Sequence, residues 1–144
     1  MRREAVGPVD MAVREADKTL SNWLFRISVS IGLFGMLFGV AMGMTQNFVL
    51  APVHAHLNLV GYVSLFMFAL YYRVVPRAAA DRLATIQAVV SVIGAILFPI
   101  GIVCVRLGDR ALFKPVLVAG WITVVTGMLL FVMIVYRSSG SGQR

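Results

Sequence analysis

The sequence is poor in charged residues, and those it has avoid long stretches of the chain. Of its 144 residues, 60% are hydrophobic and only 13% are charged. No Asp, Glu, Lys or Arg occurs in residues 27–72, 83–105 or 116–136. Apolar runs of this length are typical of a protein that is embedded in a lipid bilayer. We therefore expect an integral membrane protein rather than a soluble domain.

Cysteine, histidine and acidic residues are also scarce. The single cysteine, Cys104, excludes an internal disulfide bond, and we expect it to be a packing residue. The carboxylates all lie outside the apolar runs, so the sequence offers no acidic general acid or base within the bilayer. This absence argues against hydrolytic and group-transfer enzymes. The two histidines, His54 and His56, are the exception, because they stand one residue apart at an edge of an apolar segment.

The apolar runs predict the number of membrane-spanning helices. About 20 apolar residues cross roughly 30 Å of hydrocarbon, so the first run is long enough for two helices. Polar residues at 45–47, followed by Pro52, offer a turn between them. Continuous hydrophobicity excludes a β-barrel, whose strands alternate polar and apolar residues. The expected fold is an all-α, integral membrane four-helix bundle, with helices at 27–44, about 53–75, 83–105 and 116–136. Asp81 is placed to cap the third helix.

The distribution of Lys and Arg predicts the orientation. Ten of them lie in residues 1–26, 73–82 and 137–144, which fall on one side of the bilayer, and three lie in residues 106–114 on the other side. Cytoplasmic segments retain such residues, so both termini are expected on the cytoplasmic side. The membrane is expected to be a bacterial inner membrane. Residues 1–26 are then a cytoplasmic tail, 27–136 the transmembrane domain and 137–144 a flexible tail. The net charge of +7 reflects this topology and attraction to the lipid bilayer, and we expect no nucleic acid partner.

The two histidines fall in the first turns of the second helix, at its outer end. Pro52 suits a helix start because it has no N–H group to leave unpaired. The positive end of the helix dipole disfavours imidazolium, so both rings are expected to be neutral. Two residues correspond to about 200° of rotation, so His54 and His56 should point to nearly opposite faces. Each ring should then reach a different partner, with Asn58 on the same face as His54. Only a frayed or extended first turn would let both rings bind one ion.

This segment resembles a known helix. Residues 54–76 are similar to the tenth transmembrane helix of heme-copper oxidase catalytic subunit I, especially in C-type oxidases and the related nitric oxide reductases. The shared features are the His-x-His pair, a glycine-aromatic step, an aromatic middle and a terminal Tyr and Pro, here His54, His56, Gly61, Tyr62, Phe66, Phe68, Tyr72 and Pro76. The resemblance implies that His54 and His56 bind heme on opposite faces. Asn58 and Gly61 share the face of His54, and we expect them to belong to the cofactor-binding residues.

The chain also departs from that family, which has about twelve helices and further histidines for heme and copper. With two histidines in all, one copy of this chain cannot build a heme-copper catalytic centre. We expect heme b binding near the periplasmic face, in the service of electron transfer or of heme or gas binding. A second axial ligand would have to come from another copy, as in a dimer or higher homo-oligomer, or from a larger respiratory membrane complex.

Two other hypotheses remain open from the sequence. Met42 and Met44 close the first helix near His54 and His56, and thioether with imidazole suits copper at the outer face, with Cys104 as a further candidate ligand. Alternatively, the chain is a non-catalytic accessory or assembly subunit of a respiratory membrane complex. This hypothesis leaves the histidine pair without an assigned role.

Glycines recur at regular spacing in three of the expected helices. They are Gly35, Gly39 and Gly43 in the first, with Gly32 close by, then Gly94 and Gly101 in the third and Gly120 and Gly127 in the fourth. Small residues at such spacing normally allow close helix packing. The sequence leaves two interpretations: packing alone, or packing together with a face that is cleared for a porphyrin.

Overall fold

The computed structural model describes the backbone of residues 8–140 and the side chains of residues 19–139. This part of the chain is helical throughout, with short connections and no strand. The elements are α1 (Pro8–Thr45), α2 (Ala51–His56), the π-helix η1 (Leu57–Ser64), α3 (Leu65–Val74), α4 (Pro76–Ala79), α5 (Arg82–Leu107) and α6 (Arg110–Gly140). Because α2, η1 and α3 follow one another without a break, they form a single rod.

Four helical stretches are long and apolar enough to cross a membrane, which confirms the all-α prediction and its four helices. They are Thr19–Thr45, Ala51–Val74, Arg82–Leu107 and Arg110–Ser139. The helices extend beyond the predicted limits, most of all α1 and α6, because a helix does not have to end where charged residues begin. Helix α1 already begins at Pro8, and α6 continues to Gly140. The predicted tails, 1–26 and 137–144, are therefore partly helical, and residues 1–7 and 141–144 lie outside the described residues.

The connections form where the sequence predicted them. After α1, Gln46 adopts a positive φ of 51°, and the Asn47 side chain accepts a hydrogen bond from the Val49 N–H group (3.2 Å). The rod ends at Val74, since the next residue precedes Pro76 and leaves the helical conformation, with φ −118° and ψ 75°. The Asp81 carboxylate caps α5, as predicted.

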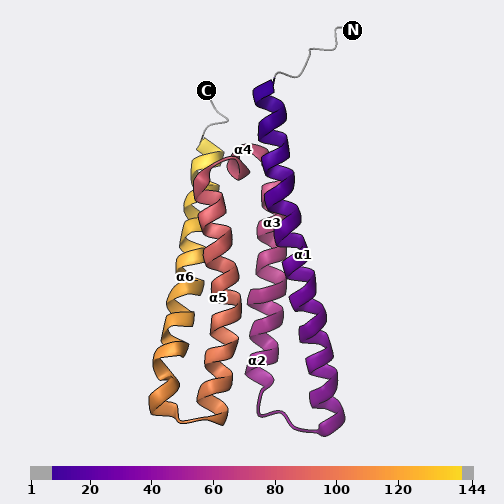
Figure 1. Ribbon diagram of the computed structural model, residues 1–144, viewed down its shortest axis with the longest axis vertical. Coiled ribbons are helices and arrows are strands. Elements are labelled where there is room, and N and C mark those ends of the chain that lie inside the picture. Colours follow the sequence, from indigo (N-terminus) through magenta and orange to yellow (C-terminus); the bar gives the residue numbers. More distant parts are fainter. Residues whose placement is uncertain (1–7, 141–144) are drawn as a thin grey trace.

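The helices lie in a row (Figure 1). Its order is α1, the α2–η1–α3 rod, α5 and α6, and each helix packs against the next. Helices α1 and α6 stand at opposite ends of this row and have no extensive contact with each other in the described part of the chain. The predicted bundle is therefore an open layer, with large apolar side chains exposed along both outer helices.

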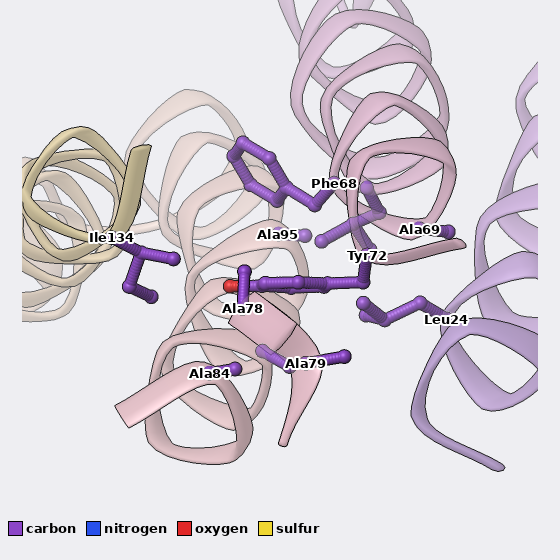
Figure 2. Close-up of a cluster of buried hydrophobic side chains, with 11 residues drawn as sticks. Leu24, Phe68, Ala69, Tyr72, Ala78, Ala79, Ala84, Ala95 and Ile134 are labelled. Carbon is purple, nitrogen blue, oxygen red and sulfur yellow. The ribbon is translucent and has the colours of Figure 1, made fainter. Parts of the chain in front are cut away.

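The hydrophobic core lies toward the end of the molecule where both termini are found (Figures 1 and 2). Tyr72 and Leu24 are fully buried there, surrounded by alanines from α3, α4 and α5. Phe131 of α6 also contacts the rod. The centroid of its ring lies 4.4 Å from the ring centroid of Phe68 and 5.1 Å from that of Tyr71. Small residues let the helices approach closely at this end, which anchors α6 to the rod as well as to α5.

Candidate functional site

The His-x-His pair lies at the end of the molecule that is opposite to the termini. Helix α2 begins at Ala51, with Pro52 in its first turn, and ends at His56. The rod therefore holds both imidazoles within one regular helical turn. The frayed start that would have let both rings bind one ion is not what the structure shows.

His54 faces α1. Its Nδ1 atom lies 2.8 Å from the backbone oxygen of Gly35. A carbonyl oxygen can only accept a hydrogen bond, so Nδ1 carries the hydrogen, and in the neutral ring the lone pair is on Nε2. Asn58 supports this arrangement from one turn further along, since its Nδ2 atom donates to the His54 carbonyl oxygen (2.9 Å). The 3.3 Å approach between Asn58 Nδ2 and His54 Nδ1 then joins two donors and is not a hydrogen bond.

His56 faces α5. Its Nδ1 atom lies 2.7 Å from the backbone oxygen of Pro52, so Nδ1 again carries the hydrogen and Nε2 the lone pair. The ring meets Phe98 of α5 edge to face, with 4.6 Å between ring centroids and 74° between planes. The two imidazoles therefore contact helices on either side of the rod. This geometry agrees with the opposed rings that helical periodicity predicts.

Side chains of the rod fill most of the glycine stripe on α1. A Cβ atom added at Gly32 would lie 2.8 Å from Tyr62, one at Gly35 would lie 2.9 Å from Asn58, and one at Gly39 would lie 2.5 Å from His54. The stripe thus accommodates three polar or aromatic side chains in successive turns. Gly43 differs, because its Cβ position has no atom within 4 Å, so no side chain of the rod fills the stripe at this glycine.

Gly61 makes the reciprocal contact from the rod. A Cβ atom added there would lie 2.5 Å from Cγ2 of Ile31 on α1. Gly61 and His54 therefore share the face that meets α1, as expected from their spacing. The glycine assists close helix packing at this position.

The glycines of α5 and α6 bring these two helices into backbone contact. A Cβ atom at Gly101 would lie 2.6 Å from Cα of Leu117, and one at Gly120 would lie 2.6 Å from Cα of Phe98. At these positions the facing helix fills the notch. Of the two interpretations of the glycine pattern, close packing describes the α5–α6 interface.

The residues of the copper hypothesis do not converge on one point. Met42 is buried, whereas 82% of Met44 is exposed, and the two imidazoles face different helices. Met42 lines a cavity of about 330 Å³ at the same end of the molecule as the histidines. Its other lining residues are Phe38, Ala41, Thr45, Asn47, Val49, Leu50 and Leu107. Cys104 is half-buried on α5. Within the described residues, no three His, Cys, Asp or Glu side chains are grouped closely enough to hold a metal ion.

Sequence reasoning missed a buried polar network that joins the rod, α5 and α6. The Tyr72 hydroxyl donates to Oε1 of Gln87 (2.8 Å), and Nε2 of Gln87 donates to Oγ of Ser91 (2.9 Å) and to the Gly127 carbonyl (3.3 Å). Both Tyr72 and Gln87 have no exposed surface. An amide within a charge-free apolar run was the available signal, because a buried polar group requires a partner.

Ser91 also borders a cavity of about 140 Å³ between the rod, α5 and α6, lined by Val60, Ser64, Leu65, Phe68, Val124 and Met128. Across that cavity, Ser64 belongs to the π-helix and donates a hydrogen bond to the Leu59 carbonyl oxygen (2.9 Å), five residues earlier. Neither the cavity nor the π-helix was predicted, because both depend on how the rod fits between its neighbours.

In comparisons with known proteins, no protein-family model, curated protein or solved structure matches the chain.

Proposed function

We propose that this chain is a membrane-embedded heme b-binding protein, with His54 or His56 as axial ligand through Nε2. The observation that supports this proposal most directly is the shared state of the two imidazoles. Each Nδ1 atom is held by a backbone carbonyl, at 2.8 Å for His54 and 2.7 Å for His56. Metal-bound histidines commonly donate their second ring N–H to such a group, which fixes the ring and presents the other nitrogen.

Membrane insertion is the first part of the proposal. Four apolar helices of sufficient length, together with exposed large hydrophobic side chains on α1 and α6, are suited to a bilayer and not to water. The bias of basic residues places both termini in the cytoplasm and the histidine pair near the periplasmic face of a bacterial inner membrane.

The ligand set of one chain favours a shared heme. The chain has two histidines, and they face opposite sides of the rod, so one copy offers a single imidazole to any one porphyrin. A six-coordinate iron requires a second strong ligand, which a symmetric second copy or a respiratory partner would supply. The open layer leaves surfaces on which a porphyrin could lie between subunits.

The protein residues have separate tasks in this proposal. Gly39 leaves space for the His54 ring, the Gly35 carbonyl orients it, and Phe98 covers one edge of His56. When bound, heme b would supply one-electron transfer or a position for a diatomic gas. The resemblance of residues 54–76 to the His-x-His helix of heme-copper oxidases supports this group of functions.

The test is a visible absorption spectrum of the purified full-length protein in mild detergent, oxidised and reduced, after expression with ample heme precursor. We expect a Soret band with sharp α and β bands on reduction, and loss of these bands in His54→Ala or His56→Ala. Added imidazole should restore them in the variant that lacks the ligand, which separates ligand loss from misfolding. A protein that is folded yet colourless in every preparation would overturn the proposal. The accessory-subunit hypothesis would then remain, or the copper hypothesis if elemental analysis found stoichiometric copper.

A further inference from the structure

A third cavity lies at the end of the molecule that carries the termini. It measures about 200 Å³ and is lined by residues of α4, the α4–α5 connection and α6, namely Arg77, Ala78, Asp81, Ile134, Arg137 and Ser138. Ala78 and Ile134 are buried and form an apolar base, whereas both arginines are exposed. A polar rim over an apolar base is suited to an amphipathic ligand.

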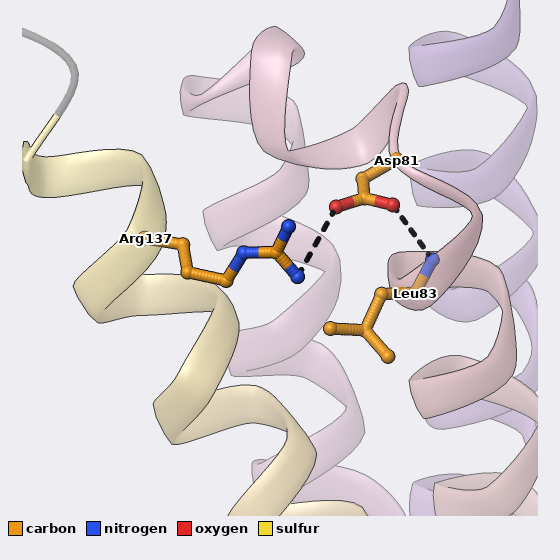
Figure 3. Close-up of polar contacts among 3 residues, drawn as sticks. All are labelled: Asp81, Leu83 and Arg137. Carbon is orange, nitrogen blue, oxygen red and sulfur yellow. Dashed lines mark hydrogen bonds and ion pairs between the residues drawn. The ribbon is translucent and has the colours of Figure 1, made fainter.

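The charges of this cavity favour an anion. Two guanidinium groups face one carboxylate, and Arg77 makes no ion pair or hydrogen bond with another side chain in the described part of the chain. Asp81 has a different task, because its Oδ1 atom accepts a hydrogen bond from the Leu83 N–H group (3.0 Å) and so caps α5 (Figure 3). The positive end of the α5 dipole further offsets the charge of this carboxylate.

The contact between Arg137 and Asp81 is loose. Nη1 of Arg137 lies 3.9 Å from Oδ2 of Asp81, and both side chains are well exposed (Figure 3). A charge-assisted hydrogen bond is about 2.8 Å long and an exposed ion pair is weak, so the contact with Asp81 restrains Arg137 little. Arginine is well suited to phosphate, because its planar group can donate two parallel hydrogen bonds to phosphate oxygens.

The position of the cavity identifies the source of the phosphate. The apolar stretch of α5 begins at Arg82, and that of α6 ends at Ser139. The cavity therefore lies level with these two helix ends. In a bilayer this is the level of the lipid headgroups. We propose that the cavity binds the phosphate of an anionic phospholipid, with Arg77 and Arg137 donating to its oxygens and Ala78 and Ile134 contacting the adjoining carbons. This inference rests on the membrane insertion proposed above and is independent of heme.

The experiment uses the full-length protein, delipidated in a neutral detergent. Phosphatidylglycerol or phosphatidylcholine is titrated in mixed micelles, and the thermal unfolding midpoint is followed by tryptophan fluorescence. We expect phosphatidylglycerol to raise the midpoint and phosphatidylcholine to have little effect. The double variant R77Q/R137Q should weaken the apparent phosphatidylglycerol affinity by about tenfold or more, since it removes charge-assisted hydrogen bonds.

A matched variant, R106Q/R110Q, removes the same charge at the α5–α6 connection, at the end of the molecule away from the termini. It should retain wild-type affinity. R77K/R137K keeps the charge and should bind more weakly than wild type, because lysine lacks the two-pronged geometry. It also serves if R77Q/R137Q does not fold. Equal losses in R77Q/R137Q and R106Q/R110Q would show non-specific charge attraction and overturn the proposal. An equal midpoint shift with inorganic phosphate would also overturn it, because the site would then recognise a free anion. Carbonate extraction of membranes tests insertion separately, so failure of the cavity and failure of membrane insertion are distinguishable.

Discussion

The imidazole of His54 lies directly against the backbone of Gly39, so closely that a Cβ atom added to this glycine would be 2.5 Å from Cε1 of the ring. The contact joins the glycine stripe of α1 to the His-x-His pair of the rod. It also places the ring where its Nδ1 atom reaches the Gly35 carbonyl. A glycine spacing that indicates helix packing therefore also positions a candidate ligand.

We expect Gly39→Ala to displace the His54 ring and to break its hydrogen bond to Gly35. Overpacking of this kind typically costs about 1–3 kcal/mol of unfolding free energy. Gly43→Ala is the matched control, because its Cβ position is open and alanine favours a helix by up to about 1 kcal/mol. Both variants should be compared by unfolding in detergent and, if the protein binds heme, by its Soret band. Equal stability of the two variants would contradict the role assigned to Gly39.

The buried pair Tyr72 and Gln87 should show coupled energetics. Tyr72→Phe or Gln87→Met leaves a buried polar partner unpaired and should cost about 1 kcal/mol each. The double variant should cost less than the sum, because the hydroxyl and its amide acceptor are then both absent. A double-mutant cycle of unfolding free energies measures this coupling. Ser30→Ala, at an exposed side chain on α1, serves as a control and should have little effect. Additive losses would show that the hydrogen bond contributes no net stability.

Gly120→Ala should separate α5 from α6. The new methyl group would lie 2.6 Å from Cα of Phe98, and a backbone atom cannot rotate away as a side chain can. The expected cost is about 1–3 kcal/mol of unfolding free energy. Since Phe98 also contacts the His56 ring, the variant should alter any spectrum that depends on His56. A variant as stable as wild type, with an unchanged spectrum, would contradict the packing described here.

The proposed orientation predicts which positions a membrane-impermeant maleimide can reach in intact spheroplasts. In a Cys104→Ala background, Asn47→Cys should be labelled, because it is exposed in the α1–α2 connection on the proposed periplasmic side. Ser139→Cys, near the carboxyl end of α6, should be labelled only after the membrane is disrupted. The reverse pattern would invert the topology and place the histidine pair on the cytoplasmic side.

The copper hypothesis illustrates why proximity in sequence was an incomplete guide to the site. Met42 and Met44 lie close to the histidines along the chain, but two residues of a helix face different directions, so one methionine is buried and the other exposed. The same periodicity correctly predicted that His54 and His56 would oppose one another. Local helical geometry was informative in both cases, whereas shared ligation required knowledge of which helices are neighbours.

Four features could be predicted from the sequence: the four apolar helices, the turn at residues 45–47, the cap at Asp81 and the opposed imidazoles. Each of these follows from local hydropathy, backbone preference or the helical repeat. Tertiary contacts were needed to establish the order of helices in the row, the hydrogen on Nδ1 of His54, the filling of the glycine stripe and the partner of Gln87. These features depend on contacts between residues far apart in the chain, and many helix arrangements satisfy the same hydropathy pattern. Close packing selects among them through the shape of the facing surfaces.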